Sequence, residues 1–326
     1  MGAGADALVA AWYRGAWWLL LLRPLECLFR LLVALRRWLY GSGLLSVYRA
    51  PVPVVVVGNI TVGGTGKTPV VIALVEALQA RGVTVGVVSR GYGARRMAGS
   101  YLVDACSRAR DCGDEALLIH RRTGCPCAVS PSRPEAARAL LAAAPVQLIL
   151  SDDGLQHYAL ARDMEIAVLD AARGAGNGLC LPAGPLREPL SRLQGVDRVL
   201  YRGSDDPDNG VRYRAVALVN VASGEQRPVA PDRPGESVHA VAGIGQPDQF
   251  FASLAALGFQ VQPHPFGDHH DYSAADFSGL ADKPIIMTEK DAVKCRTLAG
   301  ANAWYLQIEA QLPPALAEAV AALAQP

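Results

Sequence analysis

The chain has 326 residues and a formal net charge of +1, with 51% hydrophobic and 19% charged side chains. This composition excludes a disordered chain, a collagen-like fibre and a highly charged nucleic-acid-binding tail as its main character. At roughly 150 residues per domain, the length predicts about two domains. Charge is unevenly distributed, because residues 1–50 hold six arginines, two acidic residues and four of the five tryptophans, whereas the remainder is slightly acidic.

The N-terminal segment is predicted to form an amphipathic helix at a membrane surface. Its longest apolar run, residues 16–22, ends at Arg23 and Pro24 and is shorter than the about 20 residues of a spanning helix. Charges continue beyond this run without a small-residue cleavage site, which argues against a signal peptide. Leucines recur at helical spacing over residues 25–40, and arginines accompany them. This pattern favours a membrane interface, although a helix docked on its own domain has similar patterning.

Beyond Pro51, short β-branched runs alternate with helical patterns. The predicted strands are residues 54–57, 83–89, 127–129, 147–150, 166–169 and 198–201, and two predicted helices are 67–80 and 133–144. This alternation predicts a mostly parallel sheet with helices on both faces. Residues 204–235, rich in Asp, Pro and Gly, are predicted to form a linker whose alternating run near 213–221 is typical of a strand pair. A second α/β stretch includes residues 238–242 and 284–288.

A phosphate-binding loop follows the first predicted strand. Residues 58–68 read GNITVGGTGKT and lead into a predicted helix, with Thr61 where the strict pattern has glycine. Glycines let backbone N–H groups turn toward phosphate oxygens, and the helix N-terminus adds positive potential. In this pattern Lys67 reaches the β- and γ-phosphates and Thr68 offers its hydroxyl to Mg²⁺. The predicted nucleotide-binding residues are Thr61, Val62, Gly63, Gly64, Thr65, Gly66, Lys67 and Thr68.

Two acidic residues, Asp152 and Asp153, follow the apolar run 146–150. A P-loop site ordinarily uses an acid at the end of a neighbouring strand to hold Mg²⁺ directly or through water. We therefore predict that these carboxylates take part in a metal site with Thr68; the alternative is a strand-end pair in a turn.

Seven cysteines are scattered along the chain. The spacing of Cys106, Cys112, Cys125 and Cys127 fits no common zinc arrangement, because paired C-x₂-C knuckles are absent. Unpaired cysteines in a chain without a signal peptide are typical of a reducing cytoplasm.

Several strings occur together with the basic, Trp-rich N-terminus. They are GNITVGGTGKTP (58–69), SRGYG (89–93), GDE (113–115), DDGLQH (152–157), LPAGPLREP (181–189), DH (268–269) and TEKDAVK (288–294). With these strings the chain resembles the tetraacyldisaccharide 4'-kinase family, inner-membrane kinases of lipid A synthesis, from about residue 10 to residue 310. The P-loop alone is generic, whereas DDGLQH, LPAGPLREP and TEKDAVK in this order are specific.

The resemblance implies transfer of the ATP γ-phosphate, with Mg²⁺, to the 4'-hydroxyl of tetraacyldisaccharide 1-phosphate. It implies an α/β fold with a P-loop NTPase-type sheet, a smaller C-terminal α/β lobe and an N-terminal amphipathic membrane-associated helix. We divide the chain into residues 1–45 (membrane-interface helix), 46–203 (P-loop kinase core), 204–235 (linker) and 236–326 (smaller lobe). The expected location is the cytoplasmic face of the bacterial inner membrane, with anionic lipids as partners and neither nucleic acid nor an obligate protein partner.

The resemblance also implies roles for individual residues. Asp114 is the candidate base, paired with His269, and Lys67 completes the catalytic set. The candidate metal ligands are Thr68, Asp152, Asp153 and Glu115. Independently of the resemblance, loop position makes four residues candidate substrate contacts, and the alternative for each is a turn or a surface ion pair. They are Arg90 in SRGYG and, in loops after the later strands, Arg173, Arg187 and Glu188. No chemical role follows for Glu289, Lys290 or Asp291, although they lie in a specific string.

Two other functions remain open on the residues alone. A soluble P-loop ligase of the dethiobiotin synthetase type shares the loop but does not need the N-terminal Trp and Arg cluster. A membrane-bound nucleotide switch of the partitioning-ATPase kind would hydrolyse ATP slowly without transfer to lipid. A Rossmann dehydrogenase is disfavoured, because no G-x-G-x-x-G follows the first strand.

Overall fold

The computed structural model describes residues 3–64, 66–94, 99–232 and 235–325, so Thr65 lies outside the described residues. Its helices are α1 (Ala3–Arg14), η1 (Trp17–Leu22), α2 (Arg23–Gly41), α3 (Lys67–Gln79), α4 (Ala109–Cys112), α5 (Asp114–Thr123), α6 (Arg133–Ala143), η2 (Leu190–Gly195), α7 (Pro247–Ala256), η3 (Ala274–Phe277), α8 (Glu289–Cys295) and α9 (Pro314–Leu323). Its strands are β1 (Val54–Gly58), β2 (Val85–Ser89), β3 (Tyr101–Val103), β4 (Cys127–Val129), β5 (Leu148–Asp152), β6 (Met164–Asp170), β7 (Arg198–Arg202), β8 (Gly210–Asn220), β9 (Gln226–Arg227), β10 (Ser237–Ala242), β11 (Gln260–Pro265), β12 (Ile285–Thr288) and β13 (Ala303–Gln311).

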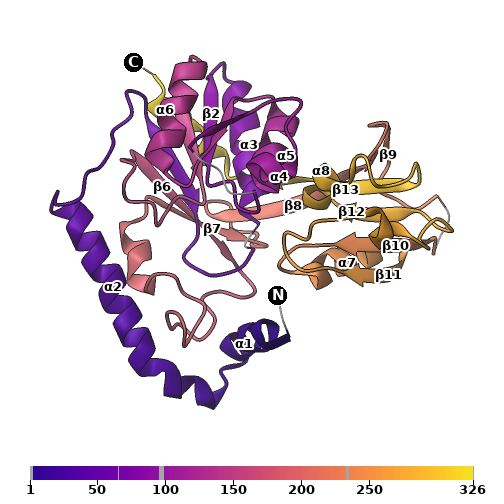
Figure 1. Cartoon of the computed structure of the whole chain (residues 1–326), viewed down its shortest axis with the longest axis horizontal. Helices are drawn as coiled ribbons and strands as arrows, with labels where there is room; N and C mark the ends of the chain where they lie inside the picture. The colour runs from indigo at the N-terminus through magenta and orange to yellow at the C-terminus, as the bar shows by residue number, and fades with distance from the viewer. Residues whose placement is uncertain (1–2, 65, 95–98, 233–234, 326) are drawn as a thin grey trace.

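The P-loop lobe consists of β1–β7 and the helices packed on them (Figure 1). Its strands run in the order β3-β4-β2-β5-β1-β6-β7, and all pair in parallel except edge strand β3. Successive side chains of a strand point to opposite faces. Val55 and Val57 accordingly pack in a core with α3 and α5, while Val54 and Val56 pack in a second core with α6. The predicted mostly parallel sheet with helices on both faces is confirmed.

The small lobe consists of β10–β12 with helices α7 and α8. Strand β10 lies between β11 and β12 and is parallel to both. Ala240 and Ala242 pack on the α7 side, whereas Val241 packs with residues of α8. The lobe therefore repeats, at smaller scale, the two-faced burial of the P-loop lobe.

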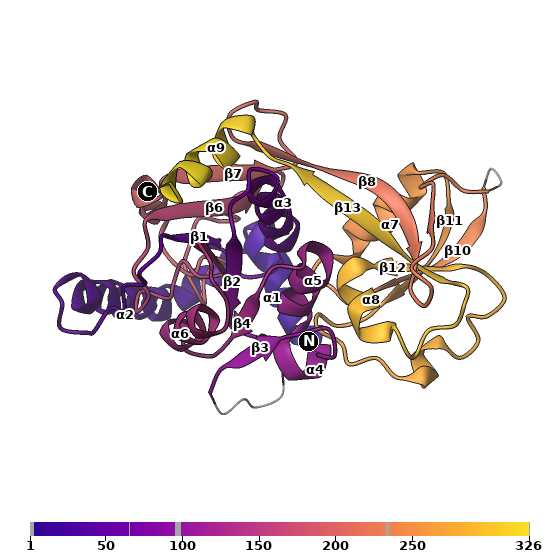
Figure 2. The same cartoon turned by 90° about the horizontal axis from the view of Figure 1, so that it is seen from above.

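Strands β8 and β13 join the two lobes (Figure 2). The first residues of β8 pair in parallel with β7, and the strand then runs antiparallel to β13, which in turn pairs with β12. The sheet is therefore continuous from β11 to β3. Residues 204–235, expected to be a linker with a strand pair, contain β8 paired with β9. The long partner β13 has no counterpart in the sequence-based elements, because its pairing is set by residues about 90 positions away.

Helix α9 packs on the P-loop lobe although the sequence grouped it with the C-terminal lobe. Its buried residues Leu316, Ala317, Val320 and Ala321 belong to the core that contains β1 and α3. The chain therefore returns through β13 to the first lobe before it ends.

The N-terminal segment is docked through a few residues. Trp12 is buried and its indole N–H donates to the Pro182 carbonyl at 3.0 Å. Glu26 is 1% exposed, lies 3.7 Å from Arg23 and Arg30, and accepts a hydrogen bond from the Cys180 backbone at 3.3 Å. Both anchors hold the segment against the loop that contains LPAGPLREP.

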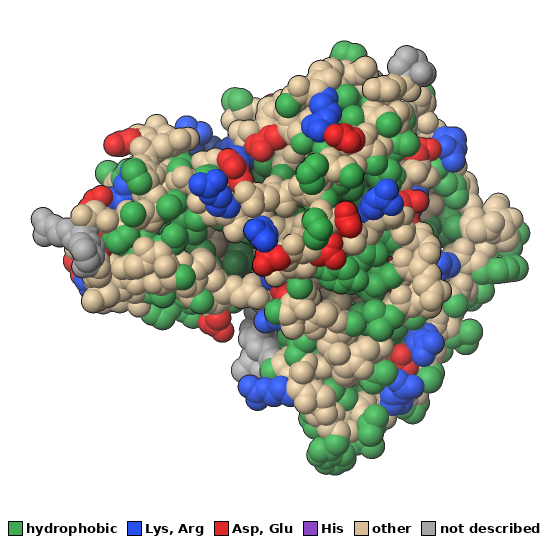
Figure 3. All heavy atoms as spheres, turned by 180° about the vertical axis from the view of Figure 1, so that it is seen from behind, with side chains coloured by type: hydrophobic (Ala, Val, Ile, Leu, Met, Phe, Trp, Pro, Cys, Tyr) green, Lys and Arg blue, Asp and Glu red, His purple; other side chains and the backbone are tan. Residues whose placement is uncertain are grey.

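The outer face of α2 is apolar and exposed. Its exposed side chains are Leu25, Leu28, Leu31, Leu32, Leu35 and Trp38, each 47–64% exposed, and Trp17 and Leu21 before it are 75% and 73% exposed. In Figure 3 the lower right margin, where α2 lies, shows hydrophobic side chains beside basic ones. We call this surface the α2 apolar face. Within the described ranges, no helix has the length and apolar character needed to span a membrane.

Candidate active site

The P-loop connects the buried end of β1 to the first turn of α3. Gly66, the N-cap of α3, has φ = 77°, and a Cβ there would meet the Tyr213 ring at 2.8–2.9 Å. Only glycine fits this turn and this close approach. Gly63 also has a positive φ, of 101°, with open space around it. The glycines on either side of Thr65, which lies outside the described residues, thus adopt left-handed backbone conformations just before the α3 N-terminus, whose free amides suit an anion.

The predicted nucleotide-binding residues separate into two groups. The Val62 amide donates to the Pro185 carbonyl at 2.8 Å, and Thr61 is buried and bridges to Leu186, so these two residues hold the 181–189 loop. The remaining described positions, Gly63, Gly64, Gly66, Lys67 and Thr68, form the loop tip and the start of α3.

Asp153 is surrounded by positive charge. Its carboxylate lies 3.3 Å from Lys67 Nζ and 3.0 Å from an Arg187 guanidinium nitrogen. Burial opposes its charge, but Lys67 and Arg187 outweigh that cost and hold the pKa of Asp153 well below its usual range. Asp153 also has φ = 48°, which turns the chain sharply after β5. The ion pairs keep Lys67 and Arg187 at the loop edge.

Asp152 has the opposite environment. It is 1% exposed, and neither carboxylate oxygen has a hydrogen-bond partner among the described residues. Burial, followed by the negative charge of Glu115, raises the pKa of Asp152 to about 7. A buried carboxylate without a partner is costly, which indicates that a cation normally completes this position.

The donor set around Asp152 suits Mg²⁺. Glu115 is close enough to Asp152 to act on its charge, and Thr68, the predicted third ligand, lies in the first turn of α3. Carboxylate and hydroxyl oxygens are hard ligands, and Mg²⁺ ordinarily takes only one or two protein carboxylates besides phosphates and water. Across residues 3–64, 66–94, 99–232 and 235–325, no three His, Cys, Asp or Glu side chains already form a metal cluster. Asp153, also predicted as a ligand, is engaged by Lys67 and Arg187. The suitability of this site for Mg²⁺ therefore rests on the two carboxylate oxygens of Asp152, which have no partner among the described residues.

Asp114 and His269 meet across the two lobes. His269 Nδ1 lies 2.9 and 3.1 Å from the two carboxylate oxygens of Asp114, which is 3% exposed. Burial would raise the pKa of Asp114, but the hydrogen bond with His269 and the charge of Lys290 lower it overall. The Tyr92 ring packs at 4.5 Å from the His269 ring. The predicted pairing of these two residues therefore exists in the structure as a hydrogen-bonded contact.

The predicted substrate residues do not all gather at this site. Arg187 joins it through Asp153, and Arg90 is exposed and close enough to help lower the pKa of His157. Glu188, in contrast, is 1% exposed and accepts hydrogen bonds from Gln156 at 2.9 Å and from Tyr158. The Arg173 guanidinium lies 5.1 Å from the Tyr13 ring of α1. Glu188 and Arg173 thus have structural partners within the protein.

Arg133 is a site residue that sequence patterning missed. It is 1% exposed, and one guanidinium nitrogen donates to the Asp152 carbonyl at 2.7 Å, while Nε and Nη1 have no partner among the described residues. Burial and the positive charges of Arg133 and Arg90 lower the pKa of His157 to about 3. The signal for Arg133 was hidden because it occupies an ordinary first turn of α6.

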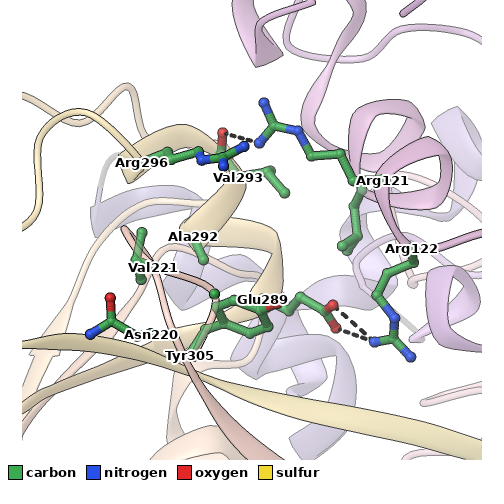
Figure 4. A pocket seen from close by; sticks show the side chains of 11 residues that line it. Arg121, Arg122, Asn220, Val221, Glu289, Ala292, Val293, Arg296 and Tyr305 are labelled. Atoms are coloured by element: carbon green, nitrogen blue, oxygen red, sulfur yellow. Dashed lines mark hydrogen bonds and ion pairs between the residues drawn. The ribbon is translucent and has the colours of Figure 1, made fainter. Parts of the chain in front are cut away.

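The two lobes also meet at the P-loop and along α5. Gln246 of the small lobe donates to the Gly64 carbonyl at 2.9 Å, and the Tyr213 hydroxyl donates to the Gly66 carbonyl. On the far side of α8, Arg122 donates to both Glu289 oxygens at 2.9 Å beside a cavity of about 200 Å³ (Figure 4). These contacts hold the small lobe against the nucleotide loop.

Comparisons with known proteins agree on one family. The family model described as "Tetraacyldisaccharide-1-P 4'-kinase" matches residues 18–325. The chain is 55% identical over 314 residues to "Tetraacyldisaccharide 4'-kinase" of Pseudomonas paraeruginosa, covering 95% of each chain, and 55% identical over 317 residues to that of Azotobacter vinelandii, covering 96% and 95%. Among solved structures it is similar to LpxK from Aquifex aeolicus in complex with ATP, with a TM-score of 0.78, 28% identity and coverage of 93% and 98%.

Proposed function

The chain belongs to the tetraacyldisaccharide-1-P 4'-kinase family, and from this premise we propose how its residues carry the reaction. The activity is ATP-dependent phosphorylation of the 4'-hydroxyl of tetraacyldisaccharide 1-phosphate, a step of lipid A synthesis. The observation that carries the mechanism is the Asp114–His269 contact, in which a carboxylate of the P-loop lobe meets a histidine of the small lobe.

ATP is the phosphoryl donor, and its phosphates are assigned to the stretch Gly63–Thr68. Backbone amides at the α3 N-terminus and the ammonium of Lys67 would neutralise the negative charge that the phosphates bring. Because Lys67 is held at 3.3 Å from Asp153, it is already directed to the loop before nucleotide binds. Asp153 and Arg187 are assigned to position Lys67.

Mg²⁺ is assigned to Asp152, Thr68 and Glu115. When bound, the ion supplies positive charge that neutralises the phosphate oxygens during transfer. The chain contributes buried acceptor oxygens on Asp152 that have no other partner in the described part of the structure. Asp153, the fourth predicted ligand, is not assigned to the metal. Its role in this proposal is to pair with Lys67.

Asp114 is assigned as the base that accepts the proton of the 4'-hydroxyl. Its lowered pKa keeps it ionised at neutral pH, and the hydrogen bond from His269 orients the carboxylate. Little covalent chemistry is needed in phosphoryl transfer, so orientation and charge supply most of the catalysis. His269 comes from the small lobe, which makes contact between the lobes a condition of activity.

The acceptor lipid is assigned to the basic surface between the P-loop lobe and α2. Arg90 is exposed there, and Arg36 of α2, also exposed, acts on the same His157. Guanidinium groups bind phosphate by paired hydrogen bonds, which fits a lipid that carries a 1-phosphate. Arg173 and Glu188 are assigned to hold α1 and the 181–189 loop, because each already has a partner in the protein.

The α2 apolar face is assigned to the lipid bilayer. Exposed leucines and tryptophans next to arginines favour the interface of an anionic membrane, where the substrate also resides. A peripheral position on the cytoplasmic face of the inner membrane follows, because ATP is available on that side. The segment is docked on the 181–189 loop through Trp12 and Glu26, so the membrane contact adjoins the acceptor site.

A transfer assay tests the activity. Purified protein is incubated with γ-labelled ATP, Mg²⁺ and tetraacyldisaccharide 1-phosphate in detergent, and the lipid fraction is counted. Labelled bisphosphorylated lipid is expected. ATP binding without labelled lipid would contradict the kinase and favour the nucleotide-switch alternative, which hydrolyses ATP slowly without an acceptor.

A further inference from the structure

Helix α8 places one lysine at the centre of the charged groups between the lobes. Lys290 Nζ lies 3.2 Å from Glu115 Oε1, 3.5 Å from Asp268 Oδ1, 3.3 Å from His269 Nε2 and 3.9 Å from Asp114 Oδ2. Its side chain is 17% exposed. Three carboxylates and one imidazole therefore surround the side-chain nitrogen, an environment that suits an ammonium group.

The contact between Lys290 and His269 determines where the histidine proton lies. An ammonium group has three donors and no acceptor, so the short contact requires His269 Nε2 to accept with its lone pair. The remaining ring nitrogen, Nδ1, then carries the proton and donates it to Asp114 at 2.9 Å. The two ring nitrogens of a histidine are distinguished by such partners.

The position of Lys290 is itself fixed by its neighbours on α8. Asp291 is completely buried and accepts a hydrogen bond from the Gly243 amide at 2.9 Å. The Thr288 hydroxyl caps the first turn by accepting from the Asp291 amide at 3.2 Å. Lys294, one turn after Lys290, lies 3.0 Å from Asp291 and 3.9 Å from Asp114. The TEKDAVK string thus forms a rigid helix start that presents its lysines to α5.

We propose that Lys290 is a positioning residue that fixes the tautomer of His269, so that Asp114 and not His269 receives the substrate proton. The proposal rests on the assigned Asp114–His269 pair. While Lys290 occupies Nε2, that nitrogen has no free lone pair for an incoming proton, so the carboxylate is the remaining acceptor. Lys290 also pairs with Glu115, the residue that follows Asp114, so one lysine contacts both adjacent carboxylates.

The first test reads the tautomer directly. Full-length protein labelled with ¹⁵N-histidine is studied by long-range ¹H–¹⁵N NMR, and the His269 signals are identified by their loss in His269→Gln. In the wild type the unprotonated nitrogen is expected to be Nε2. In Lys290→Met, Nε2 is expected to become protonated in a measurable fraction of molecules. A wild-type His269 that is unprotonated at Nδ1 would overturn the proposal.

The second test uses the transfer assay with three variants. Lys290→Met is expected to lower kcat about 10- to 100-fold, as loss of an orienting partner does, with a KM for ATP near the wild-type value. Lys290→Arg keeps a charged donor without an acceptor and is expected to retain the Nε2-acceptor tautomer and recover part of kcat. The amide of Lys290→Gln offers both a donor and an acceptor, so Nε2 is expected to be protonated in a measurable fraction of its molecules. Lys283→Met, which removes a lysine that pairs with Asp282 on the same lobe, is the matched control and should leave kcat unchanged.

These readouts separate failure of the inference from failure of the function. A wild type that binds ATP but does not phosphorylate lipid contradicts the proposed function, while the NMR result still decides the tautomer. A Lys290→Met kinase with wild-type kcat and unchanged His269 signals contradicts the role of Lys290 alone. If Lys290→Met does not fold, the wild-type tautomer and the Lys290→Gln spectrum decide the question.

Discussion

Two regions of the molecule, the interface between the lobes and the α2 apolar face, depart in opposite ways from the usual burial of apolar and exposure of charged side chains. Between the lobes, Asp114, Asp152 and Lys290 are largely removed from water. On α2, leucines and a tryptophan are about half exposed or more. Charged residues are rarely buried without partners, and wide apolar patches are rarely exposed on a monomer. Asp114 and Lys290 are paired with each other's neighbours across the lobes, so it is the Asp152 carboxylate and the α2 leucines that point to a ligand.

On our assignments, the two regions bind their ligands through different forces. The site for ATP and Mg²⁺ presents fixed charges to a charged ligand, and the gain is electrostatic and directional. The α2 apolar face is assigned to the bilayer, where removal of apolar area from water supplies the energy without a defined geometry. Substitutions in the first region are thus expected to change kcat, and substitutions in the second to change the apparent KM for lipid.

The largest effect is expected for Lys67→Ala. Removal of the ammonium leaves both the phosphates and Asp153 uncompensated, so kcat is expected to fall about 10³-fold, as when one preorganised donor of the transition state is lost. The transfer assay at saturating lipid measures this. An unchanged kcat together with a raised KM for lipid would contradict the assignment of Lys67 to the ATP site.

Asp114→Asn is expected to follow, with kcat about 10²- to 10³-fold lower and both KM values close to wild type. The amide preserves shape and can still contact His269, but it cannot take up a proton. Steady-state kinetics with ATP and lipid varied separately give kcat and the KM values for the two substrates. A variant with wild-type kcat would remove Asp114 from the mechanism.

Asp152→Asn is expected to stabilise the metal-free protein while weakening transfer. A carboxyl whose pKa is raised to about 7 in the folded state holds its proton more tightly than in the unfolded chain. Its contribution to stability is therefore present in acid and is lost as pH rises from about 4 through 7. Without Mg²⁺ at pH 8, the variant is expected to gain about 1–3 kcal/mol in free energy of unfolding.

Urea denaturation at pH 5 and pH 8 checks this expectation, since the advantage of the variant should shrink at the lower pH. Equal stability of both proteins at pH 8 would mean that Asp152 is not an uncompensated charge. The site would then lose the observation on which the Mg²⁺ assignment depends.

The smallest effect is expected for Leu28→Ser combined with Leu32→Ser on α2. Loss of apolar contact is expected to raise the apparent KM for lipid about tenfold, corresponding to about 1.4 kcal/mol, and to leave kcat and the KM for ATP unchanged. Flotation with anionic vesicles measures the membrane contact separately. Leu102→Ser, a comparably exposed leucine on edge strand β3, serves as the control. Equal losses for ATP and lipid would indicate that α2 only supports folding.

The elements that sequence patterning predicted are those whose signals are local. The strand at 54–57, the loop around Lys67 and the helix at 67–80 are each defined by a few adjacent residues, and the structure differs from them by a residue or so at each end. The helix predicted over 25–40 is also present, from Arg23 to Gly41. Periodicity and glycine spacing are sufficient for such elements.

The remaining features depend on distant partners. Asp114 and His269 are 155 positions apart, so their pairing came only from the family resemblance. Asp152 and Asp153 are adjacent and chemically identical, yet their pKa values shift in opposite directions. Lys67 and Arg187 form ion pairs with Asp153, whereas burial and Glu115 dominate at Asp152. Lys290 lacked a role for the same reason, since its partners come from two other segments, residues 114–115 and 268–269. No local pattern encodes these environments.

The β8–β13 pair has a consequence for the ancestry and engineering of the chain. The polypeptide leaves the P-loop lobe through β8 and returns beside it through β13, with Arg214 facing Glu309. The small lobe is thus topologically an insertion, an exchangeable module held by two neighbouring strands. A chain closed by a short hairpin turn between these two residues would keep α9 on its core and the P-loop at its surface. It would lack the histidine and the lysines that orient the base, and would be a nucleotide-binding domain without a transferase.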